Sequence, residues 1–153
     1  MTAEVHSRDQ QEIRDVLGES DARQYETFNY SITERQGVEA LQERLPKFQH
    51  LSEEAGEDLI VALGEVRREA EKRLTADGGK MSMVRDEGII ILYPQELKTL
   101  DERLAYARAH MAELRKRAET LLNATQLATY DQLQGAAIRN IARTLESQLK
   151  AAG

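Results

Sequence analysis

The sequence predicts an all-α protein built as antiparallel hairpins of long helices, with about five helices in total. Composition is the first reason: aromatic residues make up 5% of the 153 residues, charged residues 31%, and proline occurs only twice. Many Ala, Leu, Glu, Arg and Gln residues with few helix breakers are typical of long exposed helices. The second reason is a stretch whose apolar residues recur at alternating steps of three and four, as in a helix that packs along a partner helix. These residues are Leu97, Leu100, Leu104, Ala107, Met111, Leu114, Ala118 and Leu121.

Two helices are expected in the N-terminal third of the chain. Ser7 is a suitable N-cap for a short helix over residues 7–17. A second helix is expected over residues 21–45, because Pro46 would end it. Gly37 lies in the middle of that helix, where glycine costs up to about 1 kcal/mol relative to alanine. We therefore expect Gly37 to mark a close crossing or a bend.

A third helix is expected over residues 52–75. Ser52 can cap its first turn, and Glu53 and Glu54 place negative charge there, at the positive end of the helix dipole. Two glycines within residues 76–79 favour the end of the helix at this point.

Residues 80–93 interrupt the helical pattern. Two runs of β-prone residues lie on either side of a turn that ends at Gly88, which predicts a short β-hairpin or an extended loop. An isolated two-stranded hairpin is only marginally stable in water. The segment should therefore lie against the helices or pair with a second copy of the chain.

The last two helices are expected over residues 95–121 and 124–150, joined by a tight turn. Asn123 can accept a backbone hydrogen bond from the first turn, and Gln126 can reach back to the backbone N–H at the cap, which is a capping-box arrangement. Leu122 can pack against the helix that follows it. The heptad stretch should then be one arm of an intramolecular hairpin, whose far side faces either the chain's own core or a second copy. All of these elements fit one helical domain over residues 1–153.

The net charge of −6 is unevenly distributed. Residues 1–60 carry 14 acidic and 6 basic side chains, whereas the remainder carries a net charge of +2. An acidic N-terminal part argues against nucleic acid as the main partner, because phosphate binding needs a basic surface. The same asymmetry would let two copies, or the two halves of the chain, meet with complementary charge.

The sequence offers no catalytic constellation. It has no cysteine, and its three histidines (His6, His50 and His110) are far apart in the chain. It also has no apolar run of transmembrane length. We expect a protein that is not an enzyme, with no cofactor, no metal site and no direct insertion into a membrane.

Two helix starts carry a resemblance to a known family. Leu51-Ser52-Glu53-Glu54-Ala55 and Leu122-Asn123-Ala124-Thr125-Gln126 resemble the LTxxQ motifs of the Spy/CpxP-type bacterial periplasmic proteins. The resemblance covers about residues 51–150, and residues 25–41 look like those of small uncharacterised proteobacterial helical proteins of this layout. It implies an ATP-independent chaperone, a helical homodimer whose cradle holds partly folded clients. It also implies a periplasmic location, if an N-terminal signal or anchor has been removed; otherwise the protein is expected in the cytoplasm.

These inferences predict a non-enzymatic, polypeptide-binding protein of the bacterial envelope, chaperone-like or stress-related, and a homodimer. The alternative is a dedicated interaction module with one specific partner, such as an adaptor, a regulator or an immunity-type protein. The candidate contacts with a partner or unfolded client lie in the segment at 80–93, where methionine can repack against varied apolar surfaces. These candidates are Met81, Met83, Val84, Ile89, Ile90, Ile91, Leu92 and Tyr93. The other interpretation of the segment is that it packs on the helices or forms a dimer contact.

Overall fold

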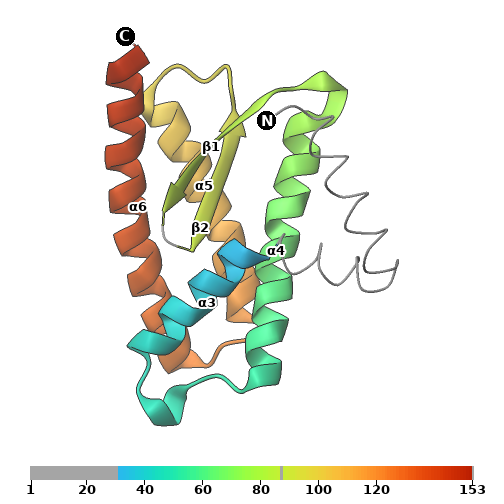
Figure 1. Ribbon diagram of the computed structural model, residues 1–153, viewed down its shortest axis with the longest axis vertical. Helices are drawn as coiled ribbons and strands as arrows, with labels where there is room; N and C mark the ends of the chain where they lie inside the picture. The colour runs from blue at the N-terminus through green and yellow to red at the C-terminus, as the bar shows by residue number, and fades with distance from the viewer. Residues whose placement is uncertain (1–30, 87, 153) are drawn as a thin grey trace, which may run out of the picture. The chain divides into compact units, whose positions relative to one another are not determined.

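The computed structural model describes residues 31–86 and 88–152, and 75% of them are helical. This part of the chain contains four α-helices, where about five were expected, and one two-stranded antiparallel sheet (Figure 1). Its elements are α3 (Ile32–Arg44), η1 (Lys47–Gln49), α4 (Glu53–Thr75), η2 (Ala76–Gly78), β1 (Met81–Asp86), β2 (Ile89–Pro94), α5 (Leu100–Glu119) and α6 (Ala124–Ala152). The helix expected over residues 7–17, and the beginning of the one expected over 21–45, lie outside the described residues.

The β-hairpin lies among the helices (Figure 1). Strand β2 contacts α4 and α5, and strand β1 contacts α6. Helix α3 meets the hairpin at its turn, where the backbones of Gly37 and Gly88 touch. The chain from Thr33 onward forms one compact unit.

The segment that interrupts the helical pattern is indeed a hairpin, paired from Met81 opposite Pro94 to Asp86 opposite Ile89. Strand β2 is buried along most of its length because neighbours cover both of its faces. Ile91 packs with residues of α5 and α6, whereas Ile90 packs beside Ala70 of α4. A strand covered on both faces has a continuous apolar run rather than an alternating one.

Local hydrogen bonds explain where α4 and α6 begin. Ser52 caps α4 by accepting the backbone N–H of Ala55 at 3.1 Å. The Gln126 N–H donates to Asn123 Oδ1 at 2.9 Å, and the Asn123 N–H donates to Gln126 Oε1 at 3.0 Å. This reciprocal pair confirms the capping box predicted at the turn between α5 and α6.

Helix α5 begins at Leu100, later than the expected start at residue 95. The Gln95 N–H donates to the Lys80 carbonyl at 3.0 Å, so the chain is still held beside β1 at this point. The helix starts only where Thr99 Oγ1 accepts the Glu102 N–H at 3.2 Å. The helix ends at Glu119, before the expected residue 121. The observed helix is therefore shorter than the predicted one at both ends.

The middle of the heptad stretch faces the chain's own core, whereas Leu121 at its end is exposed. Ala107, Met111, Leu114 and Ala118 are buried, and α5 packs against α4, α6 and β2. The second helix of the predicted hairpin, α6, extends to Ala152. The intramolecular helical hairpin predicted from the sequence is thus present.

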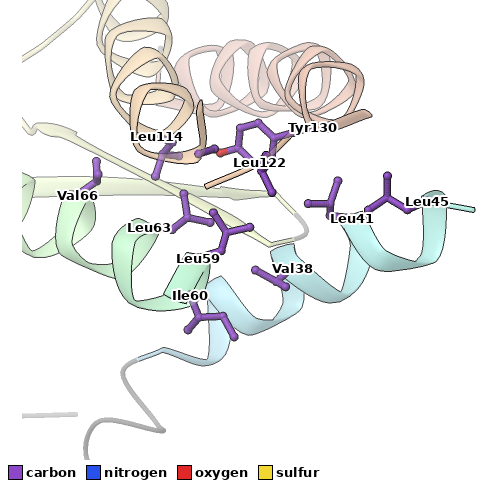
Figure 2. Packing of buried hydrophobic residues seen from close by; sticks show 11 residues of the cluster. Val38, Leu41, Leu45, Leu59, Ile60, Leu63, Val66, Leu114, Leu122 and Tyr130 are labelled. Atoms are coloured by element: carbon purple, nitrogen blue, oxygen red, sulfur yellow. The ribbon is translucent and has the colours of Figure 1, made fainter. Parts of the chain in front are cut away.

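A cluster of aliphatic side chains joins α3 and α4 to the α5–α6 hairpin. Figure 2 shows Leu59 and Leu63 of α4 and Leu41 of α3 pointing toward Leu122 and Tyr130. Burial of each such side chain stabilises the fold by about 1.5–3 kcal/mol relative to leaving it exposed. This cluster holds α3 across the end of the other helices. Both candidate sites of the protein form along α3.

Candidate functional site

The structure brings the eight predicted contact residues together in the hairpin, and most of them are turned inward. Val84, Ile90, Ile91, Leu92 and Tyr93 are buried, and Met81 and Ile89 are partly buried. Met83 is the exposed member of the set, with 52% of its surface accessible. The hairpin therefore packs on the helices, and contact between this segment and a client stays a prediction that depends mainly on Met83.

A groove of about 410 Å³ lies between α3 and the first turns of α4. Val38 and Ile60, both buried, form its apolar base. Its described lining residues include four carboxylates against one guanidinium, that of Arg35. The carboxylates are those of Glu39, Glu43, Glu53 and Glu57.

Hydrogen bonds across the groove hold its two walls together. Arg35 donates to both carboxylate oxygens of Glu57, at 2.7 and 3.1 Å, in a two-pronged pair that also fixes orientation. Gln42 of α3 exchanges two hydrogen bonds with the backbone of Leu51, at 2.9 and 3.1 Å. The groove is therefore formed before any partner arrives.

The loop that joins the two walls presents an exposed aromatic ring. Phe48 in η1 is 85% accessible, an unusual setting for a large apolar side chain. Its neighbour Gln49 is tied to the α5–α6 turn, because its carbonyl accepts Gln126 Nε2 at 2.9 Å and its Oε1 accepts Asn123 Nδ2 at 3.2 Å. Leu121, in the same turn as Asn123, is also exposed. The tethered loop thus carries apolar surface at the end of the α3–α4 pair.

A second site is a partly open cavity of about 140 Å³, bounded by α3, α4, α5, α6 and the hairpin turn. Leucine side chains form much of its wall. Nine polar or charged side chains also line it, among them Thr33, Arg44, Asp86 and Asn140. The other five are contributed by all four helices. They are Glu34, Arg67, His110, Tyr130 and Gln134.

Glu34 and Arg67 form an ion pair inside the protein. Arg67 Nε lies 2.8 Å from Glu34 Oε1, and Nη2 donates to Oε2 at 3.0 Å. Their side chains are only 8% and 14% exposed, respectively. Burial raises the pKa of Glu34, and the attraction of Arg67 opposes this shift without cancelling it.

His110 of α5 is buried against α4. Burial, together with the positive charges of Arg73 and Arg67, lowers the pKa of His110 to about 4, and Glu113 acts in the opposite direction. The imidazole is therefore neutral at pH 7. A neutral ring can both donate and accept a hydrogen bond.

This histidine makes a testable prediction about acid stability. Because the folded-state pKa of about 4 lies below the ordinary 6.5, its contribution is fully present above pH 6.5 and is lost as the pH falls toward 4. The shift corresponds to about 3 kcal/mol at 1.36 kcal/mol per pKa unit. Urea unfolding at pH 7 and pH 4 should show a free-energy loss that is smaller in His110→Gln than in the wild type by about this amount. Equal losses in both proteins would contradict the prediction, and comparing them cancels the contribution of Glu34.

Tyr130 and Gln134 of α6 form a third polar contact at the cavity. Gln134 Nε2 donates to the Tyr130 hydroxyl at 3.2 Å and to the Met111 carbonyl at 3.0 Å. Burial raises the pKa of Tyr130, so its hydroxyl keeps its proton. Within the described residues, Gln134 Oε1 accepts no hydrogen bond.

Sequence reasoning did not identify the polar residues of this cavity. His110 adjoins Met111 of the heptad stretch, and Arg67 adjoins Val66 on the inward face of α4. Their positions beside buried residues could have indicated that these two side chains lie near the core. Glu34 and Arg67 are 33 positions apart, and only the crossing of α3 over α4 reveals that they pair.

Two kinds of feature are missing from residues 31–86 and 88–152. No group of three or more His, Asp or Glu side chains in that part of the chain is arranged to hold a metal ion. None of its helices has the length and apolar character needed to cross a membrane.

The chain was also compared with known proteins. It matches no protein-family model, no curated protein and no solved structure.

Proposed function

We propose that this chain is a non-enzymatic interaction module that binds one partner polypeptide through the α3–α4 groove. The observation that carries the proposal is the composition of that groove, an apolar base of Val38 and Ile60 below four carboxylates and a single guanidinium. The partner segment that fits it is basic on one side and apolar on the other.

The acidic rim of the groove favours a partner segment with basic side chains. Lysine or arginine side chains of a partner would meet the carboxylates at the rim, and charged rims steer association and suppress wrong partners. An apolar stripe on the same segment would cover the base of the groove, as amphipathic helices do in other grooves. Phe48, on the loop between the walls, extends the apolar surface available to such a segment.

The rigidity of the groove favours one partner over many clients. The Arg35–Glu57 pair and the Gln42–Leu51 hydrogen bonds fix the distance between its walls. A preformed site gains affinity by avoiding ordering costs, whereas promiscuous binders use flexible, methionine-rich surfaces. The chaperone-like role, the envelope location and the homodimer expected from the sequence stay predictions.

The proposal is tested with two fluorescent peptides. One is an amphipathic helix of leucine and lysine, and the other has glutamate in place of every lysine. Fluorescence anisotropy should show that the lysine peptide binds and that the glutamate peptide does not. Glu39→Gln combined with Glu53→Gln should lower the affinity for the lysine peptide about tenfold, because each exposed ion pair contributes up to about 1 kcal/mol.

A matched variant separates the groove from net charge. Glu96→Gln combined with Glu146→Gln removes the same charge from exposed positions outside the groove. It should leave the affinity for the lysine peptide nearly unchanged. Equal weakening by both double variants would show non-specific attraction to an acidic protein and would overturn the proposal.

Light scattering distinguishes the module from a chaperone. An unfolding client protein is heated with and without an equimolar amount of this chain. The interaction module should leave aggregation unchanged. Suppression of aggregation that persists in the Glu39→Gln, Glu53→Gln variant would favour the chaperone-like role instead.

A further inference from the structure

We propose that the second site, the cavity of about 140 Å³, is a binding site for a small uncharged molecule that carries one hydroxyl group on an apolar body, with phenol as the simplest example. The cavity lies among α3, α4, α5 and α6 and is distinct from the α3–α4 groove. Val38 is the one described residue that lines both. The two proposals can therefore fail independently.

The polar side of the cavity has hydrogen-bonding capacity that the described protein groups leave unused. Gln134 donates its amide N–H groups to the Tyr130 hydroxyl and the Met111 carbonyl, so its Oε1 is still available as an acceptor. The Tyr130 hydroxyl accepts from Gln134, and its own proton has no acceptor within residues 31–86 and 88–152. A ligand hydroxyl is both donor and acceptor, so it can satisfy both groups.

His110 adds a third group of the same kind. Its side chain is 7% exposed and lines the cavity, and neither ring nitrogen has a hydrogen-bond partner in the part of the chain that the structure describes. A buried polar group without a partner is costly, which makes its pairing with a ligand favourable.

The buried ion pair disfavours an ionic ligand beside it, and the two other charged side chains that line the cavity, Arg44 and Asp86, are more exposed. Glu34 and Arg67 neutralise each other through two contacts of 2.8 and 3.0 Å. Beside this pair, a carboxylate ligand would compete with Glu34 for Arg67, and an ammonium ligand would compete with Arg67 for Glu34. Either exchange would leave a buried charge without its partner, which is strongly destabilising.

The size and the apolar wall suit a single ring. The cavity of about 140 Å³ is close to the roughly 150 Å³ apolar cavity that holds benzene in another protein. Leu41 of α3, Leu59 and Leu63 of α4 and Leu114 of α5 supply apolar surface to its wall. A phenol ring fits this volume with its hydroxyl directed to Gln134 and Tyr130.

Isothermal titration calorimetry with phenol, toluene and benzoate tests the proposal on the full chain. Phenol should bind about tenfold more tightly than toluene, because its hydroxyl adds one or two net hydrogen bonds of about 1 kcal/mol each. Benzoate should bind more weakly than phenol, because its charge is disfavoured beside the buried ion pair. No binding of phenol, or equal affinity for phenol and toluene, would overturn the proposal.

Two variants locate the site. Gln134→Leu should remove the preference for phenol over toluene. Ala136→Leu, which places a larger side chain at a lining position, should abolish binding of both. Ala128→Leu makes the same change at an exposed position of α6 outside the cavity and should bind phenol as the wild type does. Far-UV circular dichroism establishes that each variant is folded, and phenol binding unaffected by Ala136→Leu would contradict the assignment.

Discussion

Replacing Gly88 with alanine should lower the free energy of unfolding by about 4 kcal/mol. Gly88 adopts a φ of +79°, where a side chain is strained by about 1–2 kcal/mol. A Cβ at this position would also lie 2.6 Å from Gly37 Cα and 2.8 Å from Gly37 N. Those are backbone atoms inside α3, so the hairpin turn and the helix must separate, and overpacking of this kind costs about 1–3 kcal/mol more.

Gly78→Ala is the matched control for this prediction. Gly78 has nearly the same φ, +76°, but a Cβ there would meet nothing within 4 Å. Gly78→Ala should therefore lower the free energy of unfolding only by the backbone strain of about 1–2 kcal/mol. Urea unfolding of both variants measures the difference, and equal losses would show that the contact between Gly37 and Gly88 contributes nothing to stability.

Replacing Arg67 with methionine should lower the free energy of unfolding by about 3 kcal/mol. The substitution keeps much of the apolar bulk of the side chain but leaves the Glu34 carboxylate buried without its cation. Removing one partner of a buried pair costs about 3–5 kcal/mol, and the lower end applies here because Glu34 can take up a proton. Thermal or urea unfolding at pH 7 provides the measurement.

Two further variants show whether burial of the ion pair is the cause. Glu34→Leu in the Arg67→Met background should recover most of the lost stability, since a buried pair can be replaced by apolar side chains at little cost. Arg35→Met removes a cation from the two-pronged pair with Glu57, which also joins α3 to α4 but is 30% and 49% exposed. That loss should be below about 1 kcal/mol. A double variant as unstable as Arg67→Met alone would rule out the buried charge as the cause.

The parts of the fold that were predicted correctly depend on neighbours in sequence. Ser52 and the Asn123–Gln126 pair form their hydrogen bonds within one helical turn, so the starts of α4 and α6 follow from local residues. The start of α5 does not follow in this way. Pro94 and Thr99 both offer a helix start, and the choice depends on the hydrogen bond between Gln95 and Lys80 across the hairpin.

The sites depend on contacts that the sequence does not reveal. The sequence showed that the N-terminal part is acidic, but Glu39 and Glu53 share a groove only because α3 folds back on α4. The position of Arg67 beside Val66 indicates that it lies near the core, but nothing in the sequence indicates that its partner is Glu34. The burial that makes this pair significant arises when α3 crosses the other helices.

The placement of the hairpin has a consequence for behaviour at high concentration. A free two-stranded sheet exposes the unpaired N–H and C=O groups of both outer edges, which can recruit strands from other molecules. Here α4 packs on one face of β2 and α5 and α6 pack on the other, so the hairpin lies between helices (Figure 1). The run Ile89–Tyr93 has the apolar, uncharged character of an aggregation-prone segment. Its position between helices keeps that segment out of reach of neighbouring copies as long as the native state persists.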